Sequence, residues 1–354
     1  MTTYLIAFVG SAGLSLILTP LVRRLALRYK IMAQLPDVKS HALDHRAIPY
    51  LGGLAIFASF VVVSLTLVPL SRQLVALLIG GAILAVVGAV DDVVTISARS
   101  RLIWQFIAAA VVLAGGIGIV NLTNPLGGII NLSAGRFAVH LGSVMFHVTP
   151  IANALSILWI MGMVNTINFL DGLDGLATGV SAIAALVIFA LALAVNQPLV
   201  ALLAIILAGS ALGFLPFNFF PAKIFLGDSG AYFLGLTLAL LAIYSGGKLA
   251  TIGLVLGFTI IDAMWAAVRR IRRGVSPFTS DREHLHHLLL QAGLTQRRAV
   301  LVLYLIAAVF GAVALQSQSY SKLVALLVLF AAMVVLIASL IRIGRRKANS
   351  TTPS

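Results

Sequence analysis

Cysteine is absent from the 354-residue chain, and charged residues make up only 10% of it. The lack of cysteine excludes disulfides, thiolate zinc sites and cysteine nucleophiles. The lack of charge excludes a cytosolic globular enzyme, because soluble domains carry about 25% charged residues. Instead the chain is 61% hydrophobic, and no Asp, Glu, Lys or Arg occurs between Gly175 and Ala222. One bilayer span takes about 20 apolar residues, so the composition predicts a multi-pass membrane protein.

Apolar runs separated by turn-forming residues predict an all-α polytopic membrane protein with about eleven transmembrane helices. The region 1–343 would form a single transmembrane domain, and 344–354 would be a basic and polar tail. The stretch 121–150 is rich in Gly, Asn and Ser, which predicts an exposed loop that could carry a short hairpin. The predicted spans lie near 4–22, 51–69, 74–90, 102–120, 151–169, 176–195, 199–216, 229–245, 249–268, 299–316 and 322–341.

The basic residues orient these spans through the positive-inside rule. Most lie in alternate connections, chiefly 23–50, 91–101, 269–298 and the C-terminal tail. Of the 24 lysines and arginines, the opposite side holds only Arg72, Arg136, Lys248 and Lys322. This asymmetry predicts an N-terminus outside and a C-terminus in the cytoplasm. Because membrane topology accounts for the net charge of +14, the charge does not indicate a nucleic-acid partner.

All ten acidic residues fall on the predicted cytoplasmic side, although they were not used to assign it. Acids contribute little to topology, so a shared cytoplasmic site explains their distribution better. They are Asp37, Asp44, Asp91, Asp92, Asp171, Asp174, Asp228, Asp262, Asp281 and Glu283.

Two of these acids, Asp91 and Asp92, are adjacent and directly follow an apolar span. Adjacent carboxylates at a membrane boundary repel each other and are costly to desolvate. A solvated helix end would explain the pair, and so would a divalent-cation site or a proton acceptor. Arg101 follows closely and could hold a phosphate group.

A second motif places a polar residue at every third position, at Asn165, Asn168, Asp171 and Asp174. Neighbours in such a series are adjacent on a helix, while the whole set drifts around it. Gly172 would end the helix and allow backbone to approach a ligand closely. The structural alternative is an ordinary helix end capped by asparagine.

The third motif is Gly227-Asp228-Ser229-Gly230, preceded by Asn218 and Phe225. Asp228 and Ser229 stand before an apolar run and could simply cap a helix. The functional alternative is a hard-metal ligand beside a helix N-terminus, where backbone N–H groups also favour phosphate.

A fourth motif groups His284, His286 and His287. Zinc ligation is conceivable, but no cysteine accompanies them and the nearby acids suit magnesium, so contacts to phosphate or sugar are favoured. Asp262 lies inside the ninth predicted span, where an acid is a functional candidate, although pairing with Arg269 is a sufficient structural explanation.

Carboxylates, amides and basic side chains on one face of a membrane protein suit magnesium-assisted phosphoryl transfer. A site that faces the cytosol from within the bilayer also suits one soluble nucleotide substrate and one lipid substrate.

In this order, the four motifs resemble those of the polyprenyl-phosphate N-acetylhexosamine-1-phosphate transferases, from about Gly52 to Arg298. The resemblance implies transfer of an N-acetylhexosamine-1-phosphate, with GlcNAc-1-phosphate favoured, from a UDP-sugar to undecaprenyl phosphate. UMP would be released, and the lipid product would start a cell-envelope glycan. The enzyme would use Mg²⁺, which Mn²⁺ could replace, at the cytoplasmic face of the cell membrane.

The resemblance also implies a role for each motif residue. Asn168 and Asp228 would hold Mg²⁺. The catalytic residues would be Asp91, Asp92 and Asp174, the first two beside the attacking lipid phosphate. Phe225 would stack on the uracil. The other substrate-binding residues would be Arg101, where the family usually has lysine, Asn165, Asp171, Gly172, Leu173, Asn218, Arg282, His284, His286 and His287.

Two alternative functions remain at this stage. The peptidoglycan-precursor branch of the family usually shows a Pro-Ile-His-His-His-type sequence, which this chain lacks. A secondary transporter of an anionic solute would place ionisable residues near the bilayer midplane, between repeats, whereas these acids lie at predicted helix ends. The sequence leaves open the exact sugar, the polyprenol, the downstream polymer, a homodimer, and the roles of Lys39, His41, Arg46 and Asp262.

The charge asymmetry makes a testable prediction about topology. Cysteines introduced singly at Ser97 and at Ser133 should react with a membrane-impermeant thiol reagent from opposite sides of the membrane. The native chain has no cysteine to contribute background. Labelling of both positions from the same side would contradict the predicted orientation.

Overall fold

The computed structural model describes residues 1–32, 48–124, 128–132, 135, 137–141, 144–245, 249–272, 274, 284–317 and 319–350. Helices form most of this part of the chain. They are α1 (Thr2–Arg28), α2 (Gly53–Leu67), α3 (Arg72–Val94), α4 (Ala98–Ala114), α5 (Pro150–Leu170), α6 (Leu176–Ala194), α7 (Pro198–Asn218), α8 (Gly227–Tyr244), α9 (Leu249–Val255), α10 (Gly257–Arg272), α11 (Leu285–Gln291), α12 (Gln296–Gln316) and α13 (Ser319–Ser350).

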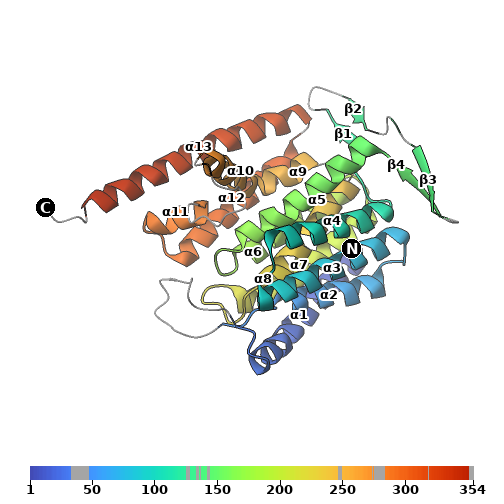
Figure 1. Cartoon of the computed structure of the whole chain (residues 1–354), viewed down its shortest axis with the longest axis horizontal. Coiled ribbons are helices and arrows are strands. Elements are labelled where there is room, and N and C mark those ends of the chain that lie inside the picture. Colours follow the sequence, from blue (N-terminus) through green and yellow to red (C-terminus); the bar gives the residue numbers. More distant parts are fainter. Residues whose placement is uncertain are drawn as a thin grey trace.

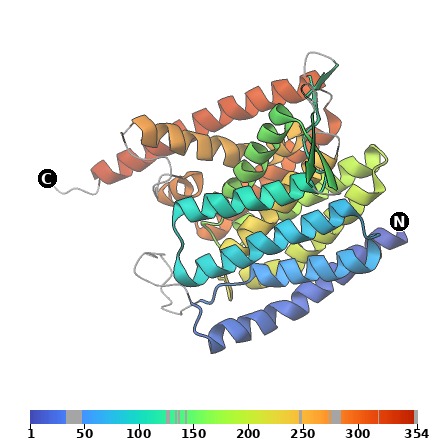
Figure 2. The same cartoon turned by 45° about the vertical axis from the view of Figure 1, so that its right-hand side comes forward.

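The helices form a bundle around α8. Helices α1 to α4 lie side by side in chain order on one flank, and α13 extends beyond the bundle at its C-terminal end (Figures 1 and 2). Nearly every side chain of α8 is buried, whereas α1 and α13 expose many large apolar side chains. A membrane provides apolar surroundings for such surfaces, and a helix satisfies its own backbone hydrogen bonds there.

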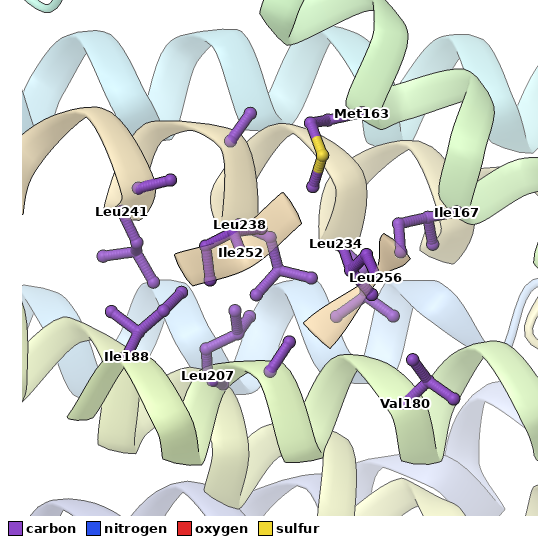
Figure 3. Close-up of a cluster of buried hydrophobic side chains, with 14 of the residues drawn as sticks. Met163, Ile167, Val180, Ile188, Leu207, Leu234, Leu238, Leu241, Ile252 and Leu256 are labelled. Carbon is purple, nitrogen blue, oxygen red and sulfur yellow. The ribbon is translucent and has the colours of Figure 1, made fainter. Parts of the chain in front are cut away.

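Apolar side chains from several helices pack together beside α8 in the cluster drawn in Figure 3. Helices α5, α6, α7 and α9 all contribute side chains that meet those of α8. This packing holds the helix ends, and the polar residues on them, in fixed relative positions. The labelled members of the cluster are Met163, Ile167, Val180, Ile188, Leu207, Leu234, Leu238, Leu241, Ile252 and Leu256.

The structure agrees with the predicted all-α polytopic membrane class. In the described residues, 8 helices are long and apolar enough to cross a membrane. The predicted span 249–268 consists of two helices, α9 and α10, which are bent by 77° where they meet and would form a ninth span as one unit. Helix α2 is apolar but has only 15 residues, and α4 has 17. Each predicted span coincides with a helix or this bent pair, and the full count of eleven stays a prediction.

Two small antiparallel hairpins occupy the stretch predicted to be an exposed loop. Strand β1 (Asn121–Thr123) pairs with β2 (Ile129–Asn131), and β3 (Phe137–Leu141) pairs with β4 (Val144–Val148). Helix α5 begins directly after β4 and ends at Leu170, next to the acidic residues. The hairpins lie at one end of the bundle, and α11 lies at the other end (Figure 1).

Candidate active site

The ends of α3 and α8 meet through the carboxylate of Asp92. The backbone N–H of Asp228 donates to Asp92 Oδ1 at 2.8 Å, and the Ser229 hydroxyl donates to Oδ2 at 3.2 Å. The first N–H groups of a helix have no partner within the helix, so a carboxylate placed there stabilises the helix start. Asp92 of α3 thus acts as the cap of α8.

This contact excludes the alternative in which Asp228 caps its own helix. Asp228 is the second residue of α8 and does not cap its own helix, because Leu226 stands at the N-cap position. The side chain of Asp228 instead accepts a hydrogen bond from Asn168 Nδ2, near the end of α5. The two residues predicted to share a metal are therefore in direct contact.

Gly227 is required where α8 begins. Its φ is +74°, a backbone conformation that side chains other than glycine rarely adopt. A Cβ at this position would also collide with the Asp92 carboxylate. Glycine therefore permits the close approach of α3 to the start of α8.

Asp91 turns toward different partners from its neighbour. It is only 4% exposed, and its carboxylate lies against the Arg101 guanidinium, with Oδ2 2.6 Å from Nε and Oδ1 2.9 Å from Nη2. The Ile96 N–H donates to Oδ1 at 2.9 Å, and the Tyr232 hydroxyl donates to Oδ2 at 3.1 Å. Asp91 is a buried, fully partnered carboxylate that positions Arg101, whose side chain remains 33% exposed.

Asp171, directly after α5, completes a cluster of acids with Asp92 and Asp228. Burial raises the pKa of Asp171 well above its ordinary value, and the negative charges of Asp228, Asp92 and Asp174 raise it further. The Gly227 N–H opposes this by donating to the Asp171 carboxylate. We call Asp92, Asp171 and Asp228, together with Asn168, the acid cluster.

Tyr50 faces the same cluster, although the sequence did not mark it as a site residue. Its pKa is raised to about 12, by burial first and then by the charges of Asp92, Asp171 and Asp228. Its ring centroid lies 5.5 Å from that of Phe225. Tyr232 was also missed, although its position four residues after Asp228 places it on the same side of α8.

Phe225, the predicted stacking residue, is half-buried and held by backbone pairing between two distant segments. Its N–H donates to Pro49 O at 2.9 Å, and its carbonyl accepts from the Gly52 N–H at 3.0 Å. The aromatic rings of Tyr50 and Phe225 are consequently neighbours, with an angle of 46° between their planes, and Tyr50 faces the acid cluster.

Asn218, predicted to bind substrate, and Asp174, predicted to be catalytic, both contact the segment that carries Phe225. Asn218 is only 2% exposed; it accepts from the Thr178 hydroxyl at 2.8 Å and donates to Ile224 O at 3.2 Å. Asp174 accepts from the Ala222 N–H at 3.0 Å. Leu173 is buried. In this structure Asn218 and Asp174 shape the loop between α7 and α8.

Asn165 lies one helical turn before Asn168, but its amide pairs away from the cluster. It donates to Gln105 Oε1 at 2.8 Å, and Gln105 lies in turn 3.4 Å from Asn165 Oδ1. This reciprocal pair joins α5 to α4.

The histidine motif contacts Gly172, the residue next to Asp171, through His286. The ring of His286 lies against Gly172, where a Cβ would collide with Nε2. Burial lowers the pKa of His286 well below its ordinary value, and the neighbouring His287 and His284 lower it further, so the ring is neutral at pH 7. His284 instead contacts Asp262 of α10 at 2.9 Å. Arg282 and the first-loop residues Lys39, His41 and Arg46 lie outside the described residues.

The cap formed by Asp92 makes a testable prediction about stability. Asp92→Ala should lower the free energy of unfolding by about 1 kcal/mol relative to Asp92→Asn, the usual effect of losing an N-cap acceptor. Both variants remove the charge, but the Asn oxygen can still accept the Asp228 N–H. Unfolding in detergent micelles measures the difference, and equal stabilities would contradict the cap.

Comparison with known proteins places these motifs in a family. Residues 74–246 match the model of glycosyl transferase family 4. Over 337 residues the chain is 33% identical to a probable undecaprenyl-phosphate N-acetylglucosaminyl 1-phosphate transferase of Bacillus subtilis, covering 93% of this chain and 89% of the relative.

More distant relatives carry similar names. A decaprenyl-phosphate N-acetylglucosaminephosphotransferase of Mycolicibacterium smegmatis is 31% identical, covering 85% of this chain and 79% of the relative. An undecaprenyl-phosphate alpha-N-acetylglucosaminyl 1-phosphate transferase of Salmonella typhi is 28% identical, covering 86% and 83%. The chain therefore belongs to glycosyl transferase family 4, with the membrane-bound polyprenyl-phosphate sugar-1-phosphate transferases that its motifs resemble.

Proposed function

We propose that this protein transfers GlcNAc-1-phosphate from UDP-GlcNAc to a polyprenyl phosphate and releases UMP. The observation that carries the proposal is the acid cluster, which joins the ends of α3, α5 and α8 around the Asp92 cap and the Asn168–Asp228 contact. The names of the relatives support the sugar and the lipid class.

The donor atoms of the acid cluster fit a hard divalent cation. Carboxylate and amide oxygens are the ligands that Mg²⁺ prefers, and no thiolate is present in the chain. Among the described residues, no three acidic or histidine side chains are already arranged as a complete metal site. Mg²⁺ ordinarily keeps water and takes substrate phosphate oxygens as ligands, so Asn168 and Asp228 would suffice as protein anchors. Bound there, the ion would neutralise charge on the diphosphate.

The reaction joins two anions, so charge neutralisation is the main task of the protein. An oxygen of the lipid phosphate would attack the β-phosphorus of UDP-GlcNAc. The bond from that phosphorus to the bridging oxygen would break, and UMP would leave with the bond electrons. A phosphomonoester has a second pKa of about 6, so the nucleophile is largely dianionic at neutral pH and needs little help from a base.

Arg101 is placed to hold such a phosphate. Its guanidinium has five N–H donors, of which Asp91 engages only part, and the side chain is partly exposed. Asp91 holds the guanidinium in one orientation through contacts at both carboxylate oxygens. The Tyr50 and Phe225 rings would receive the uracil base, since bases stack on aromatic faces.

The position of the acids also bears on the transporter alternative. Asp92 ends α3, Asp171 follows α5 and Asp228 begins α8, so the cluster belongs to helix ends. A transporter site would be expected near the bilayer midplane. We place the site at the cytoplasmic face of the cell membrane, because the basic residues concentrate on that side of the predicted topology.

The proposed reaction can be measured directly. Purified protein in detergent, supplied with undecaprenyl phosphate and Mg²⁺, should release labelled UMP from UDP-GlcNAc faster than from UDP-GalNAc, UDP-QuiNAc, UDP-FucNAc or the muramyl pentapeptide nucleotide. Detergent removes any vesicle boundary, so transport cannot produce this signal.

Two controls make the assay decisive. Without the lipid acceptor, no UMP should be released and labelled UMP should not exchange into UDP-GlcNAc. Exchange in rigorously delipidated protein would indicate a covalent enzyme intermediate in place of direct attack. If the protein releases UMP from none of these nucleotides, the proposed function is refuted.

The metal anchors give a second prediction. Asp228→Asn should reduce turnover by about 100-fold or more, because it removes a charged oxygen ligand while keeping the shape of the side chain. The thermal unfolding of the variant in detergent should stay close to that of the native protein. Excess EDTA should abolish native activity, and Mg²⁺ or Mn²⁺ should restore it. Full activity in excess EDTA would show that no such ion is needed.

A further inference from the structure

Asp262 of α10 and the start of α11 form a buried polar cluster outside the acid cluster. Asp262 and His284 are each only 7% exposed. Both carboxylate oxygens of Asp262 contact the start of α11. Oδ2 lies 2.9 Å from His284 Nδ1, and Oδ1 accepts a hydrogen bond from the Leu285 N–H at 2.9 Å. Asp262 therefore anchors the first turn of α11 through one side-chain contact and one backbone contact.

Arg270 contacts the other ring nitrogen of His284. Its Nη2 lies 3.4 Å from His284 Nε2. A guanidinium can only donate hydrogen bonds, so Nε2 must be the acceptor and the ring proton must lie on Nδ1. The hydrogen-bond network thus assigns one neutral tautomer, in which Nδ1–H donates to Asp262.

This arrangement uses both polar atoms of the His284 ring within the protein. A ring in that state has no donor or acceptor left for a phosphate or a sugar hydroxyl. Two rings lie beside it: the centroid of the Phe169 ring is 5.9 Å away, and that of the His286 ring is 5.8 Å away with an angle of 2° between the planes.

The neighbour of His284 lies close to the acid cluster. His286 lies parallel to His284 and against Gly172, next in sequence to Asp171. A fixed His284 ring therefore limits the positions open to the His286 ring. The contacts that start at Asp262 lead through these two rings to Gly172, the residue beside the acid cluster.

We infer that Asp262 and Arg270 make His284 a positioning residue, which orients α11 and the ring of His286, and that His284 does not contact the substrate. The inference rests on the proposed function, since the task of the oriented ring is to face the UDP-sugar. It differs from the role that the family resemblance implies for His284, and it assigns Asp262 and Arg270 a part in the site.

The test compares two replacements of His284. A glutamine amide offers one donor and one acceptor, so His284→Gln can donate to Asp262 and accept from Arg270. It cannot carry the charge or transfer the proton of an imidazole. His284→Gln should keep most of the UMP-releasing activity, whereas His284→Ala should lose about 10- to 100-fold, as is typical when an orienting partner is removed.

Asp262→Asn should lose activity to a similar extent as His284→Ala. The two donors meet different oxygens of Asp262, and an amide oxygen can occupy only one of those positions. The amide nitrogen would then face either the Leu285 N–H or the His284 Nδ1–H, which is a donor facing a donor. The double variant Asp262→Asn with His284→Ala should lose little beyond either single variant, because the two residues act as one unit. Additive losses would contradict the coupling.

A measurement independent of activity separates this inference from the proposed function. Amide hydrogen exchange over residues 284–291 should be faster in Asp262→Asn and His284→Ala than in the native protein, and unchanged in His284→Gln. Native protein that releases no UMP would refute the proposed function, whatever the variants do. Native protein that is active, combined with His284→Gln falling as far as His284→Ala, would overturn the positioning role.

Discussion

The carboxylate of Asp92 accepts hydrogen bonds from the first N–H groups of α8, and each side of this contact satisfies the other. The helix start is buried between other helices, where its unpaired donors would be costly, and the carboxylate is partly buried, where its charge is less well hydrated. Joining them draws the end of α3 to the start of α8, and Gly227 allows the approach without a steric collision. Once that contact is made, Asp228 is turned away from capping its own helix and toward Asn168 of α5. The geometry of the acid cluster follows from one satisfied helix end.

Several negative charges in a small buried space oppose one another, and the structure balances only part of that repulsion. Asp91 is neutralised by Arg101, with two further donors from Ile96 and Tyr232. Asp92, Asp171 and Asp228 have backbone N–H and amide donors but no equivalent cation among the contacts described above. Burial first, and then this excess of negative charge, raises the pKa values of Asp171 and Tyr50. A divalent cation and a diphosphate would enter a site whose electrostatics already favour the metal.

Under the proposed function, some site residues would contact the substrate, and other residues hold those side chains in position. Asp91 orients Arg101, Asn218 and Asp174 support the loop that carries Phe225, and Asp262 with Arg270 orients His284. Each supporting residue is buried or partly buried and has at least one polar side-chain atom in contact with the protein. Groups fixed in this way lose little conformational freedom when ligands bind, which lowers the cost of reaching the reactive arrangement.

The sequence was sufficient for the class of the protein and for the gathering of its acids, although it did not indicate Tyr50 or Tyr232. Long uncharged runs can only be stable as helices in lipid, and each predicted span coincides with a helix or with the bent pair α9 and α10. The acids were predicted to gather because they fall at the same ends of alternating spans, and the acid cluster confirms that three of them do. The length of each apolar run and the acid at its end can be read from the local sequence, without reference to the rest of the chain.

The partner of each polar group could not be predicted in the same way. Asp91 and Asp92 are neighbours in sequence, yet one binds Arg101 and the other caps α8; Asp262 meets His284, although Arg269 stood closer along the chain. Such choices depend on which helix ends are brought within hydrogen-bond distance, and that is decided by apolar packing around α8. The residue types at the site are a property of the sequence. The division between substrate-facing and supporting residues arises only from tertiary structure. The reason is that hydrogen bonds are short, and a helix end can be satisfied by any suitable group that packing brings to it.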